Sequence, residues 1–294
     1  MSDLDCKGII LAGGTGSRLY PNTIATSKQL LPIYDKPMIY YSLSVLMLAN
    51  IRDILLIANE DDISRFEKLL GNGDDFGINI SYEIQKQPRG IAEALIIGER
   101  FIDNHKVGLV LGDNLFYGQD FSSKLIAAKN SSAGANIFAK VVSNPSDFGV
   151  VEVDNEHNVL SIEEKPLKPK SDLAITGLYF YDNNASRLAS SLRPSKRGEL
   201  EISDLNALYL EDGALEVSIL GRGFTWLDTG NQDALLSASN FVQNIEHQQG
   251  FKIACLEEIA FKKNWISEVD LERRISILGS SAYTRYLAAL LISS

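Results

Sequence analysis

A glycine-rich segment near the start of the chain has the composition of an anion-binding turn. Gly13-Gly14-Thr15-Gly16 follows an apolar run that ends at Leu11 and Ala12. Glycines let the backbone bend and bring its N–H groups close to an anion without a Cβ in the way. Arg18 follows at once, and a guanidinium there can clamp phosphate oxygens. The segment therefore predicts a phosphate site, although a tight turn without a ligand uses the same glycines.

Two well-known phosphate motifs do not fit this segment. The Gly-Lys-Ser/Thr ending of a P-loop is missing, and Leu19 stands where a dinucleotide-binding fingerprint has its third glycine. Ten residues after Arg18, Lys28 adds a second cation that could complete a positive lining for a triphosphate. Alone it would be an ordinary surface lysine. Gln29 offers both a donor and an acceptor, as recognition of a base edge requires.

The elements that must position these residues alternate in the first half of the chain. Apolar runs typical of short strands lie at 7–12, 53–58, 78–84 and 107–111, and helical spacing lies at 38–50, 61–70 and 90–101. Near-continuous apolar strands separated by helices indicate a parallel sheet covered on both faces. We expect the carboxyl ends of its strands to carry the site.

The pattern changes after about residue 135. Closely spaced strands are expected at 135–142, 149–154, 159–162 and 174–181, which predicts a mixed sheet whose later strands cover a cleft. Helices are expected at 231–248, 257–264, 268–278 and 281–292. The last carries an apolar stripe that includes Tyr283 and Leu287, which suits either core packing or a subunit contact.

Composition describes a soluble globular chain and narrows its partners. It has 294 residues, 45% hydrophobic, with 28 Lys and Arg against 38 Asp and Glu for a net charge of −10. This balance argues against general affinity for nucleic acid or anionic membranes. Apolar runs are too short to span a membrane, and the acidic start at residues 1–5 predicts no secretory signal. Cys6 and Cys255 have no metal-ligand spacing, which suits a reducing cytoplasm.

Several segments in order along the chain resemble the signature of the sugar nucleotidyltransferases. They are 13–21, 27–41, 111–114, 163–166, 176–182, 197–202 and 226–230. The Ser27-Lys28-Gln29 version is similar to that of the thymidylyltransferases in this family, whereas related uridylyltransferases carry Pro-Lys-Glu. The resemblance covers nearly the whole chain.

The resemblance implies an α/β fold and a reaction. The fold is a Rossmann-like, mostly parallel or mixed central sheet flanked by helices, with an inserted β-rich sugar-binding part and a helical C-terminus. It implies a core at 1–230, with a nucleotide-binding half at about 1–115 and a sugar-binding half at about 116–230, and a helical segment at 231–294. The reaction joins dTTP and glucose 1-phosphate to give dTDP-glucose and pyrophosphate, with Mg²⁺. Because two polyanions meet, positioning and charge neutralisation must supply most of the catalysis.

The resemblance also assigns roles to single residues. Arg18 and Lys28 would neutralise the triphosphate, and Lys165 would receive the sugar phosphate. Asp113 and Asp228 would hold Mg²⁺, which favours few carboxylates plus phosphate oxygens and water. Without the resemblance, a strand-end aspartate is as well explained by a turn. The implied nucleotide contacts are Leu11, Gly13, Gly14, Thr15, Gly16, Gln29, Gln85, Gly90 and Asp113. The implied sugar contacts are Asn114, Gly149, Glu164, Lys165, Ile175, Thr176 and Trp226.

Three positions depart from the family pattern. Arg89 stands where an acidic residue is common, Glu93 where a glutamine is, and Phe148 where a tyrosine is. They leave a preference for UTP or for another sugar phosphate open as the alternative. Glu199 and Glu201 suit a solvated face or a helix start, although the resemblance places Arg197 and Glu199 at the ligand cleft.

The family is generally homotetrameric and is feedback-inhibited by dTDP-rhamnose at a second site between subunits. Tyr117, Gly118 and Arg222 resemble parts of that site, and Arg222 equally suits a plain turn. A binding or regulatory protein on the same scaffold, without turnover, is the rival from another functional class. The four charged residues Arg18, Lys28, Asp113 and Asp228 argue against it.

Overall fold

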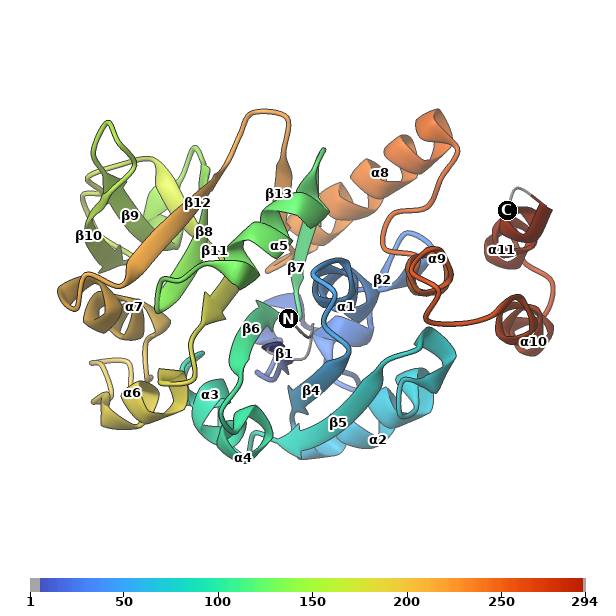
Figure 1. The fold of residues 1–294 in the computed structure, drawn as a ribbon, viewed down its shortest axis with the longest axis horizontal. Helices are drawn as coiled ribbons and strands as arrows, with labels where there is room; N and C mark the ends of the chain where they lie inside the picture. Colours follow the sequence, from blue (N-terminus) through green and yellow to red (C-terminus); the bar gives the residue numbers. More distant parts are fainter. Residues whose placement is uncertain (1–5, 293–294) are drawn as a thin grey trace.

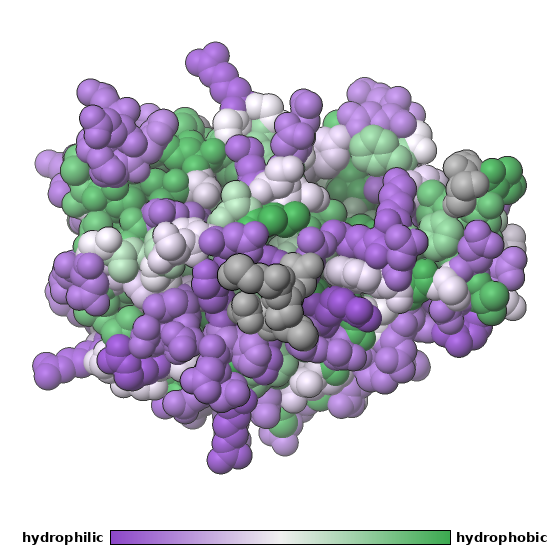
Figure 2. Space-filling view, in the orientation of Figure 1, coloured by the Kyte–Doolittle hydropathy of each residue, from purple (hydrophilic) through white to green (hydrophobic). Residues whose placement is uncertain are grey.

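The structure is a computed structural model that describes residues 6–292. Residues 1–5, the acidic start considered above, and residues 293–294 lie outside the described residues. Among the described residues, no helix has the length and apolarity needed to cross a membrane. Figure 2 shows hydrophilic residues over most of the face drawn there, with apolar residues gathered toward the end where β8–β12 lie.

A nine-stranded mixed sheet forms the centre of the molecule (Figure 1). Its strands are β1 (Cys6–Ala12), β4 (Asp53–Ala58), β5 (Asn79–Ile84), β6 (Lys106–Leu111), β8 (Ala135–Val141), β9 (Gly149–Val153), β10 (Val159–Glu164), β11 (Leu173–Tyr181) and β12 (Leu215–Leu220). The order β10-β9-β11-β6-β1-β4-β5 is parallel from β6 to β5, and β11 pairs antiparallel with β6. β8 joins β11 to β12. The predicted mixed α/β sheet is confirmed.

Helices cover both faces of this sheet and continue to the C-terminus. They are α1 (Ile39–Leu48), α2 (Glu60–Leu70), α3 (Glu93–Ile97), α4 (Glu99–Ile102), α5 (Phe121–Asn130), α6 (Ala185–Ser191), α7 (Ile202–Glu211), α8 (Gln232–Gln249), α9 (Leu256–Lys262), α10 (Glu268–Leu278) and α11 (Ala282–Ile292). The single helix expected at 90–101 is wrong, because the chain forms α3 and α4 around Gly98. A Cβ at Gly98 would lie 2.6 Å from Ile9 Cδ1, so the chain packs closely against β1 at this glycine.

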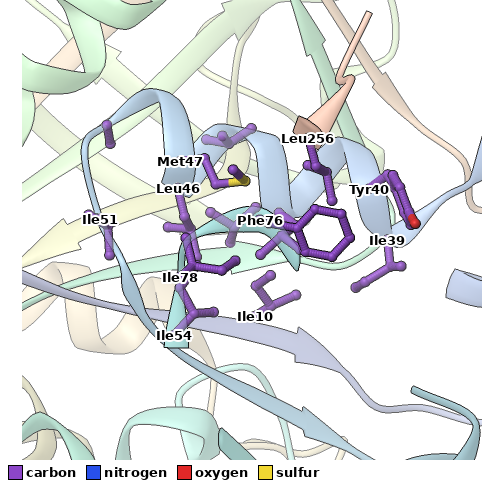
Figure 3. Packing of buried hydrophobic residues seen from close by; sticks show 14 of the residues in the cluster. Ile10, Ile39, Tyr40, Leu46, Met47, Ile51, Ile54, Phe76, Ile78 and Leu256 are labelled. Carbon is purple, nitrogen blue, oxygen red and sulfur yellow. The ribbon is translucent and has the colours of Figure 1, made fainter. Parts of the chain in front are cut away.

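The buried side chains of β1 face two different cores. Ile10 belongs to the cluster under α1, together with Leu46 and Phe76, whereas Ile9 belongs to the cluster on the opposite face. Figure 3 shows the first cluster, with Phe76 among the side chains of α1 and Ile10. Because successive strand residues point to opposite faces, a strand buried on both must be apolar throughout.

The C-terminal helices pack onto the first core. Leu256 of α9 lies beside Phe76 and the start of α1 in Figure 3, and Leu287 of α11 is also fully buried. Tyr283 and Tyr286 of α11 pack against the same cluster, which supports the core-packing interpretation of its stripe. Ile292 is 87% exposed at the end of α11. In Figure 1, α10 and α11 lie at the end of the molecule opposite β9 and β10.

A separate antiparallel ribbon crosses the middle of the molecule. It pairs β7 (Asn114–Tyr117) with β13 (Thr225–Asp228), and the registered partners are Asn114 and Asp228 at one end. A second short pair joins β2 (Pro32–Ile33) and β3 (Lys36–Pro37). The ribbon matters most for function, because it brings segments more than 100 residues apart to one point. The sequence patterns did not predict it, since each strand has only four residues.

Candidate active site

A cavity of about 550 Å³ opens where the strands of the central sheet end. Every residue assigned above to catalysis, nucleotide, sugar or metal lies in its lining. These are Leu11, Gly13, Gly14, Thr15, Gly16, Arg18, Lys28, Gln29, Gln85, Gly90, Asp113, Asn114, Gly149, Glu164, Lys165, Ile175, Thr176, Trp226 and Asp228. The cavity therefore brings together residues that lie up to 217 positions apart in the chain.

The glycine-rich loop forms one wall, directly after β1. Gly14 and Gly16 have φ of +94° and +59°, in the left-handed region that favours glycine. Asn59 Nδ2 donates to the Gly14 carbonyl at 2.8 Å, and Thr23 Oγ1 donates to the Gly16 carbonyl at 2.7 Å. Arg18 lies in the short 3₁₀ helix η1 (Ser17–Leu19) that follows. Because both loop carbonyls are occupied from outside the loop, the backbone is held in place for an incoming anion.

The β7–β13 ribbon places two carboxylates at the opposite wall. Asp113 directly precedes β7, and Asp228 ends β13 beside Asn114. Thr229 Oγ1 donates to the Asp113 carbonyl at 2.9 Å, which ties the two strand ends together. Lys28, in η2 (Lys28–Leu30), donates to Asp113 Oδ2. Two acids and a cation thus share one corner.

Arg18 reaches the same corner from the glycine loop. A Cβ at Gly230 would lie 3.5 Å from Arg18 Nη1 and 3.6 Å from the Asp228 carboxylate oxygens. The guanidinium and the carboxylate therefore flank the same glycine. The arginine, the lysine and the two aspartates converge on one pocket, as predicted.

The two aspartates differ in their protonation behaviour. Burial would raise the pKa of Asp113, but Lys28 and a hydrogen bond from Asn114 outweigh it and hold the pKa below its ordinary value. Burial and the neighbouring Asp113 raise the pKa of Asp228 to about 6, against the opposing effects of Lys28, Arg18 and Lys165. Two carboxyl groups in one partly dehydrated corner need extra positive charge to ionise together.

The donor set suits a hard divalent cation. Within residues 6–292, no cluster of three or more His, Cys, Asp and Glu side chains has a metal-binding arrangement. Asp113 and Asp228 offer two carboxylates beside an open cavity, which matches Mg²⁺ because that ion keeps water and takes phosphate oxygens. The fit rests on the shared corner and on the raised pKa of Asp228, which positive charge would relieve.

A second part of the lining consists of amide side chains. Gln29 and Gln85 are both buried, with exposed fractions of 4% and 3%. Gly90, with φ of +105°, lies against the Leu200 backbone, where a Cβ would come within 2.3 Å of the carbonyl oxygen. Gln85 Nε2 donates to Glu93 Oε2 at 2.8 Å, and Arg89 pairs with the same carboxylate. The two departures at 89 and 93 thus contact each other.

The remaining wall comes from β10, β11 and the segment before α7. Glu164 accepts from Ser203 Oγ at 2.5 Å and from Arg197 Nη2 at 3.2 Å. Arg197 also binds Glu201 at 2.7 Å and Glu199 at 3.4 Å. Lys165 follows β10 with a φ of +43° and is exposed at the cavity. Of the two interpretations of Glu201, the solvated face is wrong, because its side chain is 8% exposed and is held by Arg197, whereas the helix start is confirmed, because Glu201 directly precedes α7.

Trp226 closes this wall. Its Nε1 donates to Asn114 Oδ1 at 2.6 Å, and its ring packs 5.0 Å from that of Phe148. Asn114 Oδ1 also accepts from the Gly177 N–H at 3.1 Å. Thr176 Oγ1 is buried and, within the described part of the chain, has no hydrogen-bond partner. Thr176 therefore brings to the cavity wall a hydroxyl that no described protein group satisfies.

Further residues line the cavity although no ligand role was predicted for them. Ser203, Glu201 and Pro88 are examples, and Glu93 lies behind the wall as the partner of Gln85. Arg89 and Arg197 each pair with a glutamate four residues later, but the first residue of each pair lies outside a helix, so helical spacing would not have predicted the contacts. Ser203 left no signal in the sequence, because its role depends on how α7 packs against β10.

The residues assigned to a second, regulatory site lie elsewhere. Tyr117 ends β7, and its hydroxyl donates to Gln249 Oε1 at 2.6 Å. A Cβ at Gly118 would collide with the Phe224 ring, and Arg222 is exposed in the turn before β13. None of the three is part of the cavity lining in the described structure. Their regulatory role stays a prediction.

Comparison with known proteins agrees with this arrangement. The model of the nucleotidyl transferase family matches residues 7–245. The chain belongs to the nucleotidyl transferase family. It is 58% identical over 285 residues to the glucose-1-phosphate thymidylyltransferase of Neisseria gonorrhoeae, covering 97% of this chain and 99% of that protein. It is 51% identical to that of Mycobacterium tuberculosis, with the same coverage.

A solved structure shows the same fold. It is a Bacillus anthracis protein described as a candidate glucose-1-phosphate thymidylyltransferase in complex with sucrose. It is 40% identical, with a TM-score of 0.75, and the match covers 80% of this chain and 94% of that one. The central sheet and its flanking helices therefore have the fold of this solved structure.

Proposed function

We propose that this nucleotidyl transferase is a glucose-1-phosphate thymidylyltransferase. It would convert dTTP and glucose 1-phosphate into dTDP-glucose and pyrophosphate. The observation that carries the proposal is the convergence of Arg18, Lys28, Asp113 and Asp228 on one cavity. The names of relatives at 51–58% identity over 97% of the chain support it.

The chemistry is an in-line displacement at the α-phosphorus. An oxygen of the sugar phosphate forms the new P–O bond, and the bond to pyrophosphate breaks. The glycine-rich loop and Arg18 would hold the triphosphate, and Lys28 would offset charge near the α-phosphate. Lys165 and Arg197, at the facing wall, would guide the second anion. Positioning two like-charged reactants in this way can supply a large share of the barrier reduction.

A divalent cation fits beside Asp113 and Asp228, and we propose Mg²⁺. When bound, it would neutralise phosphate charge and orient the triphosphate. Asp113 would be ionised at this site, because Lys28 and Asn114 keep its pKa low. Asp228 would give up its proton more readily once positive charge lies near it.

The sugar would lie against the wall formed by β10 and β11. Glu164, fixed from two sides by Ser203 and Arg197, presents a carboxylate to sugar hydroxyls. Thr176 Oγ1 offers a second polar contact. Phe148 lacks the hydroxyl of the tyrosine that is usual there, so the ring would contribute only apolar contact beside Trp226.

The direct test is a pyrophosphate-release assay with purified protein. We expect release only when dTTP, glucose 1-phosphate and Mg²⁺ are all present. Absence of release at saturating substrates would overturn the proposal. Nucleotide-sugar binding without release would instead favour the non-catalytic regulator.

A uridylyltransferase is the second candidate, favoured by the departures at Arg89 and Glu93. The ratio of kcat/KM for dTTP and UTP decides between the two, and we expect dTTP to be preferred. We also propose a cytoplasmic location, which the cysteine usage suits, and a division at residue 230, where the helical pattern begins. The homotetramer is what the family resemblance implies. Size-exclusion chromatography with light scattering tests the assembly.

A further inference from the structure

Glu93 sits behind the cavity wall with three donors on its carboxylate. It is the first residue of α3 and is 4% exposed. Arg89 Nε donates to Oε1 at 2.7 Å, and the Arg89 backbone N–H donates to Oε2 at 3.2 Å. Gln85 Nε2 donates to the same Oε2 at 2.8 Å. Glu93 does not line the cavity, and Gln85 is the cavity-lining side chain that it contacts.

This contact fixes which end of the Gln85 amide faces the cavity. A carboxylate accepts hydrogen bonds and cannot donate, so the NH₂ group must face Glu93. The carbonyl Oε1 then points the other way, toward Gly13. A Cβ at Gly13 would lie 2.1 Å from Oε1, so this oxygen already occupies the space above the glycine. Gln85 therefore shows an acceptor to the cavity.

Gln29 shows the opposite polarity. Ser27 Oγ donates to Gln29 Oε1 at 2.5 Å, which occupies the carbonyl end and leaves Nε2 as the free donor. Both amides line the same cavity. One presents a donor and the other an acceptor, and each is held by a residue behind it.

Among the pyrimidine bases, only one class matches a free donor and a free acceptor in the same cavity. Thymine and uracil carry an N3–H donor next to carbonyl acceptors. Cytosine carries an unprotonated N3 acceptor next to an amino donor, so it reverses both groups. A buried donor or acceptor left without a partner costs far more than a well-made contact gains. Reversing the polarity of Gln85 would therefore reverse the preferred base.

We propose that Glu93 is a positioning residue that locks the Gln85 amide with its carbonyl toward the cavity, so that the site demands a base with an N3–H donor. The inference rests on the proposed function, because it assumes that Gln29 and Gln85 meet the base. Arg89 holds the Glu93 carboxylate from the solvent side, with its own side chain 65% exposed. Without the Arg89 side chain, the backbone N–H of residue 89 still donates to Glu93 Oε2, and Glu93 still accepts from Gln85.

The first test uses the unmodified protein and calorimetric titration with dTTP, dCTP and N3-methyl-dTTP in Mg²⁺. We expect dCTP and N3-methyl-dTTP to bind at least ten times more weakly than dTTP. Equal binding of the three nucleotides would overturn the inference. This measurement needs no variant and no turnover, so it remains informative if pyrophosphate release fails and the proposed reaction is wrong.

The second test separates Glu93 from a merely structural role. Glu93→Met removes the acceptor at similar side-chain length, and we expect the dTTP-to-dCTP ratio of kcat/KM to fall about tenfold, mainly through KM for dTTP. Glu93→Gln should stay within threefold of the original ratio, because its amide oxygen can take the place of Oε2. A loss of stability alone would change kcat for both nucleotides and leave their ratio unchanged.

Two controls match the variants. Glu258→Met removes a similarly buried acceptor outside the cavity lining. Glu258 forms an ion pair with Lys262, which lies four residues later in the chain. Arg89→Met removes the outer partner of Glu93. Both should keep the original ratio within threefold. An unchanged ratio in folded Glu93→Met, or an equal fall in Glu258→Met, would overturn the inference.

Discussion

Two clusters of charged side chains in the described structure are built differently. One is the cavity corner of Arg18, Lys28, Asp113 and Asp228. The other, here called the C-terminal junction, lies where α8–α11 meet the rest of the chain. Its charged residues are Asp35, Lys36, Asp75, Glu246, Lys252, Glu257 and Arg274. The first cluster lines the candidate active-site cavity, and no residue of the second belongs to that lining.

Charges in the junction are matched by neighbours from the chain itself. Glu246 accepts from Lys36 and Lys252, each at 3.0 Å. Burial would raise the pKa of Asp35, but Lys36 and Lys252 together hold it below its ordinary value. In the cavity corner, by contrast, Asp228 keeps a pKa raised by burial and by Asp113. Buried charge by itself does not mark a functional site, whereas incompletely compensated charge beside a cavity does.

Asp113→Asn should give the largest effect and should act on catalysis. Removing a charge that the reaction needs costs about 1000-fold in kcat, because a metal ligand and the partner of Lys28 are lost together. We expect the free energy of unfolding to change by less than about 1 kcal/mol, since asparagine keeps an acceptor for Lys28 and repulsion with Asp228 disappears.

Pyrophosphate release and urea denaturation of the same preparation measure these two quantities. A folded Asp113→Asn protein with near-normal kcat would show that the metal assignment is wrong. If Asp113→Asn lost both folding and activity, the charges of this corner would stabilise the fold, as those of the junction do.

Glu257→Gln should show the opposite pattern. Glu257 is fully buried, with Arg274 Nε at 3.3 Å and the Tyr283 hydroxyl at 2.6 Å. Breaking a buried pair leaves Arg274 undercompensated, at a cost of about 3 kcal/mol, or roughly 150-fold in the unfolding equilibrium. The kcat of the folded fraction should stay within about twofold.

Urea denaturation at constant m-value measures the stability change. Arg273→Ala is the matched control, because its pair with Asp270 is exposed and should contribute less than about 1 kcal/mol. Equal effects of the two substitutions would contradict the assigned role of the junction.

The sequence predicted the sheet better than it predicted the ribbon. Strands β1, β4 and β6 are near-continuous apolar runs, because they are buried on both faces, and their pattern identified them. The pairing of β7 with β13 left no such pattern. It depends on which short segments meet after folding, and the register Asn114–Asp228 is a tertiary property.

Site residues divide in a similar way. Arg18 and Lys28 stand next to recognisable motifs, so their types and spacing indicated phosphate chemistry. Asp228 could be assigned only through the family resemblance, because nothing local distinguishes it from a turn residue. Glu93 was noticed as a departure, and only the structure shows that it contacts Gln85.

The smallest predicted effect is a pH dependence that distinguishes the cavity from the junction. With its pKa at about 6, Asp228 is about one-tenth ionised at pH 5 and about nine-tenths ionised at pH 7. A cation that needs this carboxylate should therefore bind about tenfold more tightly at pH 7 than at pH 5. Titration calorimetry with Mn²⁺ at constant ionic strength measures the ratio, and Asp228→Asn should abolish it.

Asp228 changes the free energy of unfolding with pH in the direction opposite to that of an ordinary salt-bridged acid. The unfolded chain ionises Asp228 near pH 4, so the native state binds more protons between about pH 4 and 6. Its contribution to stability therefore falls as the pH rises through this window, until a cation compensates the charge. Asp35 has a lowered pKa, so its contribution is lost only as the pH falls. A Mn²⁺ affinity that does not change between pH 5 and 7 would place Asp228 with the internally compensated charges of the junction.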